Sequence, residues 1–264
     1  MVIYERLSMF NNAFFKNLLN NPKQLGLDEN DLQNYKSDRR RDIILGEYFA
    51  EVSKTAGRLA ANFLYRGRWG KVDSDWFDHR IQFLYPEKTF NDLWCITSVN
   101  AIQKLPLGGK LLDICSGDGF FAFYFYKTRA EHIDCIEINP MLYKHSKKHH
   151  SANNINYICA NILEYDLRSE AYDVVVIRGA IEHFSESNQN IIFQKVINSL
   201  KTNGYFLGDT PANPTKDSKM LKAHENEWAD EAEMRNQLQP YFSHLETQTI
   251  VSKDRTNLFW CCQK

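Results

Sequence analysis

The stretch from Lys110 to Phe121, KLLDICSGDGFF, is the feature that most constrains how this chain can fold. Leu111, Leu112 and Ile114 give it the apolar run of a buried parallel strand, and a turn of small residues follows. Such a turn lets main-chain N–H groups and a helix N-terminus approach a ligand closely. We therefore expect a strand, a tight turn and the start of a helix, with the charged end of a ligand held at the turn.

A second apolar strand follows about twenty residues later and ends in a carboxylate, in Cys135-Ile136-Glu137-Ile138-Asn139. Glu137 could there bind the two hydroxyls of a ribose. Nicotinamide and flavin enzymes use a similar turn and acidic residue, so an oxidoreductase is an alternative. Two features disfavour it. The full G-x-G-x-x-G is absent, and Asp113 places a negative charge where a pyrophosphate would lie.

At these residues the chain resembles the class I S-adenosylmethionine-dependent methyltransferases, over residues 110–264. Asp113, Gly117 and Gly119 match the family pattern, whereas Cys115 stands where the family usually has its first glycine. The resemblance implies S-adenosylmethionine as cofactor, with its methionine end at Asp113 and the turn, its ribose at Glu137, and its adenine amino group at Asn161. The expected cofactor-binding residues are Asp113, Cys115, Ser116, Gly117, Asp118, Gly119, Glu137, Ile138, Asn161, Ile162 and Arg178.

From about Leu107 onward, short apolar strands alternate with helix-like segments, which predicts an α/β fold with a Rossmann-like, doubly wound and mostly parallel sheet. We expect seven strands, at 110–115, 133–138, 155–160, 172–177, 205–209, 245–252 and 256–262. The closing hairpin resembles the antiparallel last strand of the family. Residues 1–105 lack strand alternation and predict a helical N-terminal cap, with helices near 3–19, 29–35, 42–63 and 90–103. Residues 106–264 form the expected catalytic domain, with a lid insertion at 209–228.

The loop after the fourth strand contains Glu182 and His183, and in an open α/β sheet this loop faces the ligand crevice. The pair resembles the Glu-His pair of many small-molecule methyltransferases. We expect His183 to act as a general base oriented by Glu182, with His224 as a second proton acceptor. Alternatively, His183 packs against the cap or bonds a loop carbonyl, and His224 caps a helix. No recognised metal-ligand spacing links these residues, so no metal is expected.

Large aromatic and cationic side chains lie close together in the cap segment, including Trp76, His79 and Arg80. Such a mixture suits an anionic or sugar-nucleotide substrate. Trp228, in the insertion, could form a wall for a sugar or aromatic ring. The alternative is that the tryptophans anchor the domain junction and the lid, while the arginines pair with nearby aspartates.

Composition narrows the class of partner and the compartment. With 264 residues, 43% hydrophobic and 25% charged, the chain reads as a soluble globular protein. A net charge of −1 gives no broad attraction to nucleic acid or anionic lipid. Six cysteines without metal or disulfide spacing indicate a reducing cytoplasm. No export signal or transmembrane segment is expected, and the helical apolar stripe within residues 3–18 predicts packing on the body or on a second subunit, or docking on a membrane surface.

These features together predict a methyltransferase that acts on a small polar acceptor, with an oxygen atom as the first choice. The closest resemblance is to enzymes that methylate sugars, sugar nucleotides or phosphate-like decorations in capsular or other surface polysaccharide and natural-product biosynthesis. Alternative acceptors are a quinone or phenol, a protein, or a nucleic acid. Base methylation is disfavoured because the Asn/Asp-Pro-Pro-aromatic signature is absent. A non-catalytic nucleotide-binding partner module is the alternative of another class.

Overall fold

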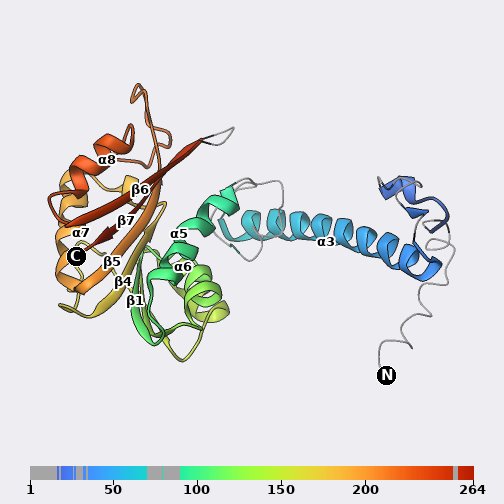
Figure 1. Cartoon of the computed structure of the whole chain (residues 1–264), viewed down its shortest axis with the longest axis horizontal. Coiled ribbons are helices and arrows are strands. Elements are labelled where there is room, and N and C mark those ends of the chain that lie inside the picture. Colours follow the sequence, from blue (N-terminus) through green and yellow to red (C-terminus); the bar gives the residue numbers. More distant parts are fainter. Residues whose placement is uncertain are drawn as a thin grey trace. The chain divides into compact units, whose positions relative to one another are not determined.

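The computed structural model describes residues 17, 19–25, 27, 32, 33, 35–69, 79, 90–251 and 255–264 (Figure 1). The chain divides into two compact units, residues 1–74 with 81–86, and residues 75–80 with 87–264. The expected boundary at residue 105 therefore differs from the observed one, because the helix at 90–104 belongs to the sheet unit. Each unit is described by itself.

The first unit contains a short 3-10 helix, η2 (Pro22–Leu25), and the long helix α3 (Ser37–Trp69). Helix α3 extends beyond the expected 42–63 at both ends. Its start is favoured by Asp38 in the first turn, and no proline interrupts it. A small core forms where Leu32 packs with Ile44 of α3. The helices expected near 3–19 and 29–35 fall largely outside the described residues.

The second unit is built on a seven-stranded sheet of order β3-β2-β1-β4-β5-β7-β6. Strands β1 to β5 are parallel, and β7 is antiparallel to both β5 and β6. The predicted Rossmann-like fold with an antiparallel last strand is thus confirmed. The strands are β1 (Gly109–Ile114), β2 (Ala130–Glu137), β3 (Ile155–Cys159), β4 (Tyr172–Arg178), β5 (Leu200–Pro211), β6 (His244–Val251) and β7 (Thr256–Gln263).

Capping residues fix where several helices of this unit begin. The side chain of Asn139 accepts a hydrogen bond from the main chain of the first turn of α6, where Pro140 suits the first helical position. Ser185 caps α7 and Asp230 caps α8 in the same way. The helical elements are α5 (Phe90–Lys104), the π-helical η3 (Ala122–Tyr126), α6 (Pro140–His149), the 3-10 turn η4 (Ile181–His183), α7 (Glu186–Ser199) and α8 (Glu231–Leu238).

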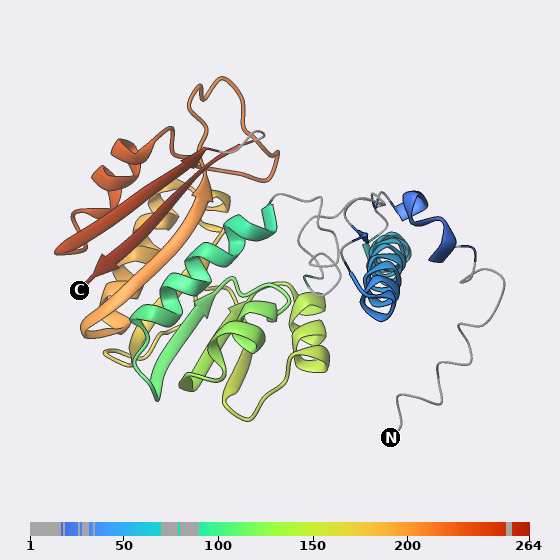
Figure 2. The ribbon, with the colours of Figure 1, turned by 45° about the vertical axis from the view of Figure 1, so that its right-hand side comes forward.

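Both faces of the sheet are covered, with α5 on one face and α7 on the other (Figure 2). Successive strand residues point to opposite faces, so Val175 and Ile177 enter the core cluster that contains α7 residues, while Val174 and Val176 face the α5 side. This double burial explains the continuous apolar runs of β1 and β4. Among the described residues, no helix combines the length and apolarity needed to cross a membrane. None of the six cysteines forms a disulfide.

Gly208, in the middle of β5, is predicted to be essential for folding. A Cβ there would lie 2.1 Å from Trp260 Cζ2 and 2.5 Å from the main-chain oxygen of Ile177. We expect Gly208→Ala to lower the free energy of unfolding by about 3 kcal/mol or more. Urea unfolding followed by tryptophan fluorescence measures this change. The control is Gly46→Ala in α3, where no described atom lies within 4 Å of the added Cβ. An unchanged unfolding midpoint for Gly208→Ala would contradict the prediction.

Candidate active site

The turn after β1 adopts a left-handed backbone at three positions, with φ of 54° at Cys115, 59° at Gly117 and 75° at Gly119. A Cβ on Gly119 would lie 2.5 Å from the hydroxyl oxygen of Tyr157 in β3. No described atom lies within 4 Å of a Cβ built on Gly117. The turn is therefore closed against the protein at Gly119 and open at Gly117, where a ligand can approach the main chain. The buried members of the expected cofactor set are Asp113, Ser116, Asp118, Gly119, Glu137 and Ile162.

Glu137, at the end of β2, reaches across to this turn. One carboxylate oxygen accepts a hydrogen bond from the Gly117 N–H at 2.9 Å, and the other accepts one from the Asn139 N–H at 2.8 Å. Burial raises the pKa of the Glu137 carboxyl above its ordinary value, against the opposite effect of these N–H donors. A carboxylate oxygen can accept more than one hydrogen bond. Both oxygens are thus held in place and can still accept bonds from the hydroxyls of a ligand.

The expected adenine-side residues follow β2 and β3. Ile138 is 62% exposed and offers an apolar surface beside the carboxylate. The side chain of Asn161 is engaged locally, because its Oδ1 accepts from the Leu163 N–H at 3.1 Å and its Nδ2 donates to Glu164 at 3.1 Å. An amide oxygen has two lone pairs, so Asn161 retains one acceptor position.

Asp113 and Arg178, at the ends of β1 and β4, form an ion pair inside the protein. Arg178 Nη2 lies 3.1 Å from Asp113 Oδ2 and 3.3 Å from Oδ1, and the Asp113 side chain is fully buried. The guanidinium also lies 3.8 Å from the centroid of the Phe121 ring. Burial raises the pKa of the Asp113 carboxyl, and the charge of Arg178 opposes that shift. Two residues expected to hold the cofactor thus bind each other within the chain.

Asp209 of β5 adds a second buried carboxylate beside this pair, a feature that the sequence analysis missed. It lies opposite Arg178 in the strand register, and the Thr97 hydroxyl of α5 donates to its Oδ2 at 2.6 Å. Burial raises the pKa of Asp209 to about 6. In the same helix, Ser98 bonds the Tyr126 hydroxyl at 2.9 Å. The sequence signal was the adjacent Thr-Ser pair in the middle of α5.

Asp118, in the turn, is bound to His79. The main-chain N–H of His79 donates to Oδ2 at 2.8 Å, and its ring Nδ1 lies 2.9 Å from Oδ1. Burial alone would raise the pKa of the Asp118 carboxyl, but the charge and hydrogen bonds of His79 lower it to about 2. His79 was expected to contact substrate, and the structure places it against the turn and beside Phe121. Trp76 and Arg80 lie outside the described residues.

Glu182 lies in η4, immediately after β4, and is 3% exposed. The Thr210 hydroxyl donates to its Oε2 at 3.0 Å. Its main-chain oxygen accepts from the N–H of Glu225 at 2.7 Å, which ties the turn to the insertion. Burial raises the pKa of the Glu182 carboxyl to about 7.

His183 and His224 meet beside this carboxylate, with ring centroids 4.8 Å apart and planes at 89°. His183 Nδ1 lies 3.2 Å from the main-chain oxygen of Ala223, and His224 Nδ1 contacts a carboxylate oxygen of Glu227. Burial, with a smaller effect of His224, lowers the pKa of His183. A carbonyl oxygen can only accept, so the proton of neutral His183 sits on Nδ1, which leaves Nε2 as an acceptor. His183 thus bonds a loop carbonyl, the weighed alternative, without losing the ability to take a proton.

Trp228 is 1% exposed and belongs to the hydrophobic core. Its ring packs near-parallel to Phe193 with centroids 6.5 Å apart, and edge-on to Trp260 at 5.5 Å. Its Nε1 donates to Gln237 at 2.6 Å. A wall for a substrate needs an exposed ring face, so the structure places Trp228 in the anchoring role that was weighed against substrate contact.

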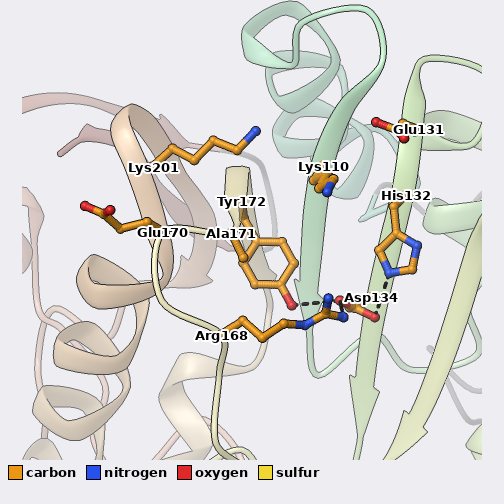
Figure 3. A pocket seen from close by; sticks show the side chains of 9 residues that line it. All are labelled: Lys110, Glu131, His132, Asp134, Arg168, Glu170, Ala171, Tyr172 and Lys201. Atoms are coloured by element: carbon orange, nitrogen blue, oxygen red, sulfur yellow. Dashed lines mark hydrogen bonds and ion pairs between the residues drawn. The ribbon is translucent and has the colours of Figure 1, made fainter.

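A cavity of about 340 Å³ lies near the amino ends of the strands, away from the glycine turn (Figure 3). Figure 3 shows Tyr172, His132 and Arg168 converging on Asp134. The Asp134 carboxylate accepts from the Tyr172 hydroxyl at 2.7 Å and lies 3.0 Å from His132 Nε2. Burial opposes these partners, whose hydrogen bonds, together with that of Asn156, lower its pKa. The residues lining this cavity include none of the expected site residues, and its central carboxylate is satisfied within the protein.

Comparison with known proteins finds similarity to methyltransferases over part of the sheet unit. Residues 111–204 match the family described as methyltransferase domain. The chain is 32% identical over 105 residues to the phosphoethanolamine N-methyltransferase of Plasmodium falciparum (isolate 3D7). The aligned stretch covers 39% of this chain and 40% of that protein. The chain thus spans about two fifths of the length of that relative.

Solved structures agree on the fold. The N-methyltransferase NodS from Bradyrhizobium japonicum WM9, in complex with S-adenosyl-L-homocysteine, superposes with a TM-score of 0.56 at 12% identity, over 67% of this chain and 89% of that one. A chain from a complex of the Haloferax volcanii Trm112 methyltransferase activator with a methyltransferase gives a TM-score of 0.56 at 12% identity, over 67% and 92%. At this identity the likeness concerns the fold alone.

The buried ion pair should matter for stability. We expect Arg178→Met to lower the free energy of unfolding by about 3–5 kcal/mol, because it leaves Asp113 buried without its cation. The double variant with Asp113→Asn should recover part of that loss. Urea denaturation measures both. The control is Lys201→Met, which breaks a part-exposed pair with Asp173 and should lose less than about 1 kcal/mol. Equal losses for the two single variants would show that burial does not distinguish these pairs.

The turn should be acid-sensitive through Asp118. Its folded pKa of about 2 is below the ordinary 3.8, so its stabilising contribution is complete above about pH 4 and is lost as pH falls toward 2. The loss amounts to about 2 kcal/mol. Asp118→Asn should therefore flatten the pH dependence of unfolding in that window, measured by urea titrations at stepped pH. Asp166→Asn, at an exposed position, is the control. Parallel curves for the wild type and Asp118→Asn would disprove the assignment.

Proposed function

We propose that this chain is a class I S-adenosylmethionine-dependent methyltransferase, and that it transfers the methyl group of this cofactor to a small polar acceptor. The observation that carries the proposal is the carboxylate of Glu137, held by the N–H groups of Gly117 and Asn139 beside an open left-handed turn. This arrangement fits a ribose diol at the carboxylate and a charged group at the turn. The exposed face of Ile138 fits an adenine ring.

Methyl transfer requires alignment of the donor with the acceptor and, for a hydroxyl acceptor, removal of one proton. When bound, S-adenosylmethionine would supply an electrophilic methyl carbon for attack by the acceptor lone pair, and its sulfur would keep the electron pair of the broken carbon–sulfur bond. Glu137 and the turn orient the donor. His183, through Nε2, takes the proton of the acceptor, and the polar side chains of Glu182 and His224 lie beside it at the same edge of the sheet.

We propose an oxygen of a sugar, a sugar nucleotide or a phosphate-like group as the acceptor, in surface polysaccharide or natural-product biosynthesis. The net charge of −1 and the polar side chains of Glu182, His183 and His224 favour a small polar molecule over a nucleic acid as the acceptor. The substrate named for the Plasmodium falciparum relative, phosphoethanolamine, is also small and polar. That relative favours a second candidate function, methyl transfer to the nitrogen of a phosphate-bearing amine.

Six cysteines without a disulfide suit a reducing compartment, and we propose the cytoplasm as the location. A homodimer, one of the arrangements that would cover the apolar stripe within residues 3–18, also stays a prediction.

The decisive test of donor binding is calorimetric titration with S-adenosylhomocysteine, with NADH in parallel. We expect binding of S-adenosylhomocysteine alone, weakened about 100-fold or more by Glu137→Ala because two charge-assisted hydrogen bonds are lost. Glu131→Ala, at an exposed position in the same strand, is the matched control. No binding of S-adenosylhomocysteine, or binding that Glu137→Ala leaves intact, would contradict the proposal.

Turnover is tested with methyl-labelled donor and a panel of sugar nucleotides and phosphoethanolamine. His183→Ala should bind S-adenosylhomocysteine normally and lose transfer to an oxygen acceptor. A non-catalytic module would bind the donor and transfer no label to any acceptor.

A further inference from the structure

We infer that Glu182, His183 and His224 form a binding site for a divalent transition-metal cation such as Zn²⁺. One ligand atom of each side chain lies within 4.8 Å of the others. The three come from two segments that the fold brings together, the η4 turn after β4 and the insertion after β5. The sequence analysis expected no metal, because the two segments are about forty residues apart and show no recognised spacing.

The orientation of the two imidazoles is the second argument. Metal-bound histidines almost always donate their other ring N–H to a carboxylate or a main-chain carbonyl. His183 directs Nδ1 to the Ala223 carbonyl, and His224 directs Nδ1 to the Glu227 carboxylate. Each ring therefore presents Nε2 as its free lone pair.

Glu227 is itself held in place, as an outer partner of a metal ligand should be. Its carboxylate accepts from the main-chain N–H of Met220 at 2.9 Å and from the side-chain amide of Asn213. These bonds hold the carboxylate in place beside the His224 ring. Glu227 thus fixes the orientation of that ring and directs Nε2 toward the cluster, as the outer partners of metal-bound histidines do.

Glu182 supplies the negative charge. Its carboxylate is 3% exposed, and Thr210 donates to one of the two oxygens. A buried carboxylate is stabilised by a cation at close range. The hydroxyl of Thr210 leaves Oε1 for a ligand bond and orients the group, as ligating carboxylates are commonly oriented.

The donor set selects the kind of cation. Two imidazole nitrogens and one carboxylate oxygen are the ligands of several catalytic zinc sites that keep a fourth position open. Magnesium and calcium prefer oxygen ligands throughout. Zinc–nitrogen bonds of about 2.0–2.1 Å need the three side chains to close by roughly 1 Å, which requires small side-chain rotations of the two rings.

The role of the cation rests on the proposed function, whereas its binding does not. A cation in this place would polarise an acceptor oxygen and favour loss of its proton. His183 is then a ligand in the cation-bound protein, and a proton acceptor only in the cation-free protein. The two forms differ in an observable way, because a chelator would change turnover in the first case alone.

A second histidine cluster provides an internal comparison. Asp118, His145 and His150 also lie within 4.8 Å of one another. There the carboxylate of Asp118 is already bound by His79 and by the N–H of Phe120 at 3.1 Å. Its charge is therefore satisfied within the chain, and we expect a cation to prefer the Glu182 cluster.

The test uses the full chain after dialysis against a chelator. Zn²⁺ is titrated by calorimetry, and Co²⁺ by its visible absorption. We expect one equivalent of Zn²⁺, and a Co²⁺ spectrum of low-symmetry nitrogen and oxygen ligation. His224→Ala and Glu182→Gln should each weaken Zn²⁺ binding more than about 100-fold, and Glu227→Gln about 10- to 100-fold. The controls are His244→Ala, at an exposed position in β6, and His150→Ala in the second cluster. Both should bind as the wild type does.

Titration of the same metal-free samples with S-adenosylhomocysteine separates the two proposals. Binding of S-adenosylhomocysteine without Zn²⁺ binding would overturn the cation site and leave the methyltransferase proposal intact. Zn²⁺ binding that survives in His224→Ala and Glu182→Gln, or is lost in His150→Ala, would also overturn the assignment. Zn²⁺ binding that follows the expected pattern supports the site even where S-adenosylhomocysteine fails to bind.

Discussion

The buried ion pair between Asp113 and Arg178 is the interaction around which the polar end of the sheet is arranged. Both side chains emerge on the α5 side of neighbouring parallel strands, where Val174 and Val176 of β4 are also buried. Neither charge is tolerable there alone. Beside this ion pair, the Thr97 hydroxyl of α5 donates a hydrogen bond to one carboxylate oxygen of Asp209. The helix is therefore held to the strand ends by a polar bond as well as by packing. The pair thus positions the glycine turn that follows Asp113.

Two polar groups of different character occupy the carboxyl edge of the sheet. On one side, the carboxylate of Glu137 is held by main-chain donors and faces an open turn, which suits a ligand rich in hydroxyls. On the other, Glu182, His183 and His224 gather where η4 meets the insertion. A donor at the first group and an acceptor at the second are what methyl transfer requires, because the reaction depends above all on alignment. The same second group has the composition of a cation site.

Several parts of the site were predictable from local sequence. Strand β1, its small-residue turn and the carboxylate at Glu137 follow from apolar runs bounded by glycines. The position of Glu182 and His183 directly after β4 also follows from the sequence, and the rule that ligands bind beyond the carboxyl ends of parallel strands made them candidate site residues. Two contacts were not predictable: that of Arg178 with Asp113, which are 65 positions apart, and that of His79 with Asp118, which are 39 positions apart. No sequence pattern links the members of either pair. Trp228 was expected at a substrate wall with anchoring as the alternative, and no periodicity indicated that core packing would cover its ring.

The sequence by itself determined the order of strands and helices, the antiparallel closing strand and the location of the glycine turn, because hydrophobic periodicity and backbone freedom are local properties. Only the tertiary structure decided which charges meet. The orientation of His183 and His224 depends on a carbonyl at Ala223 and a carboxylate at Glu227, which the insertion brings back across the end of β4. Hydrogen bonds and ion pairs depend on distances of a few ångströms, and those distances are set by packing of the whole sheet unit.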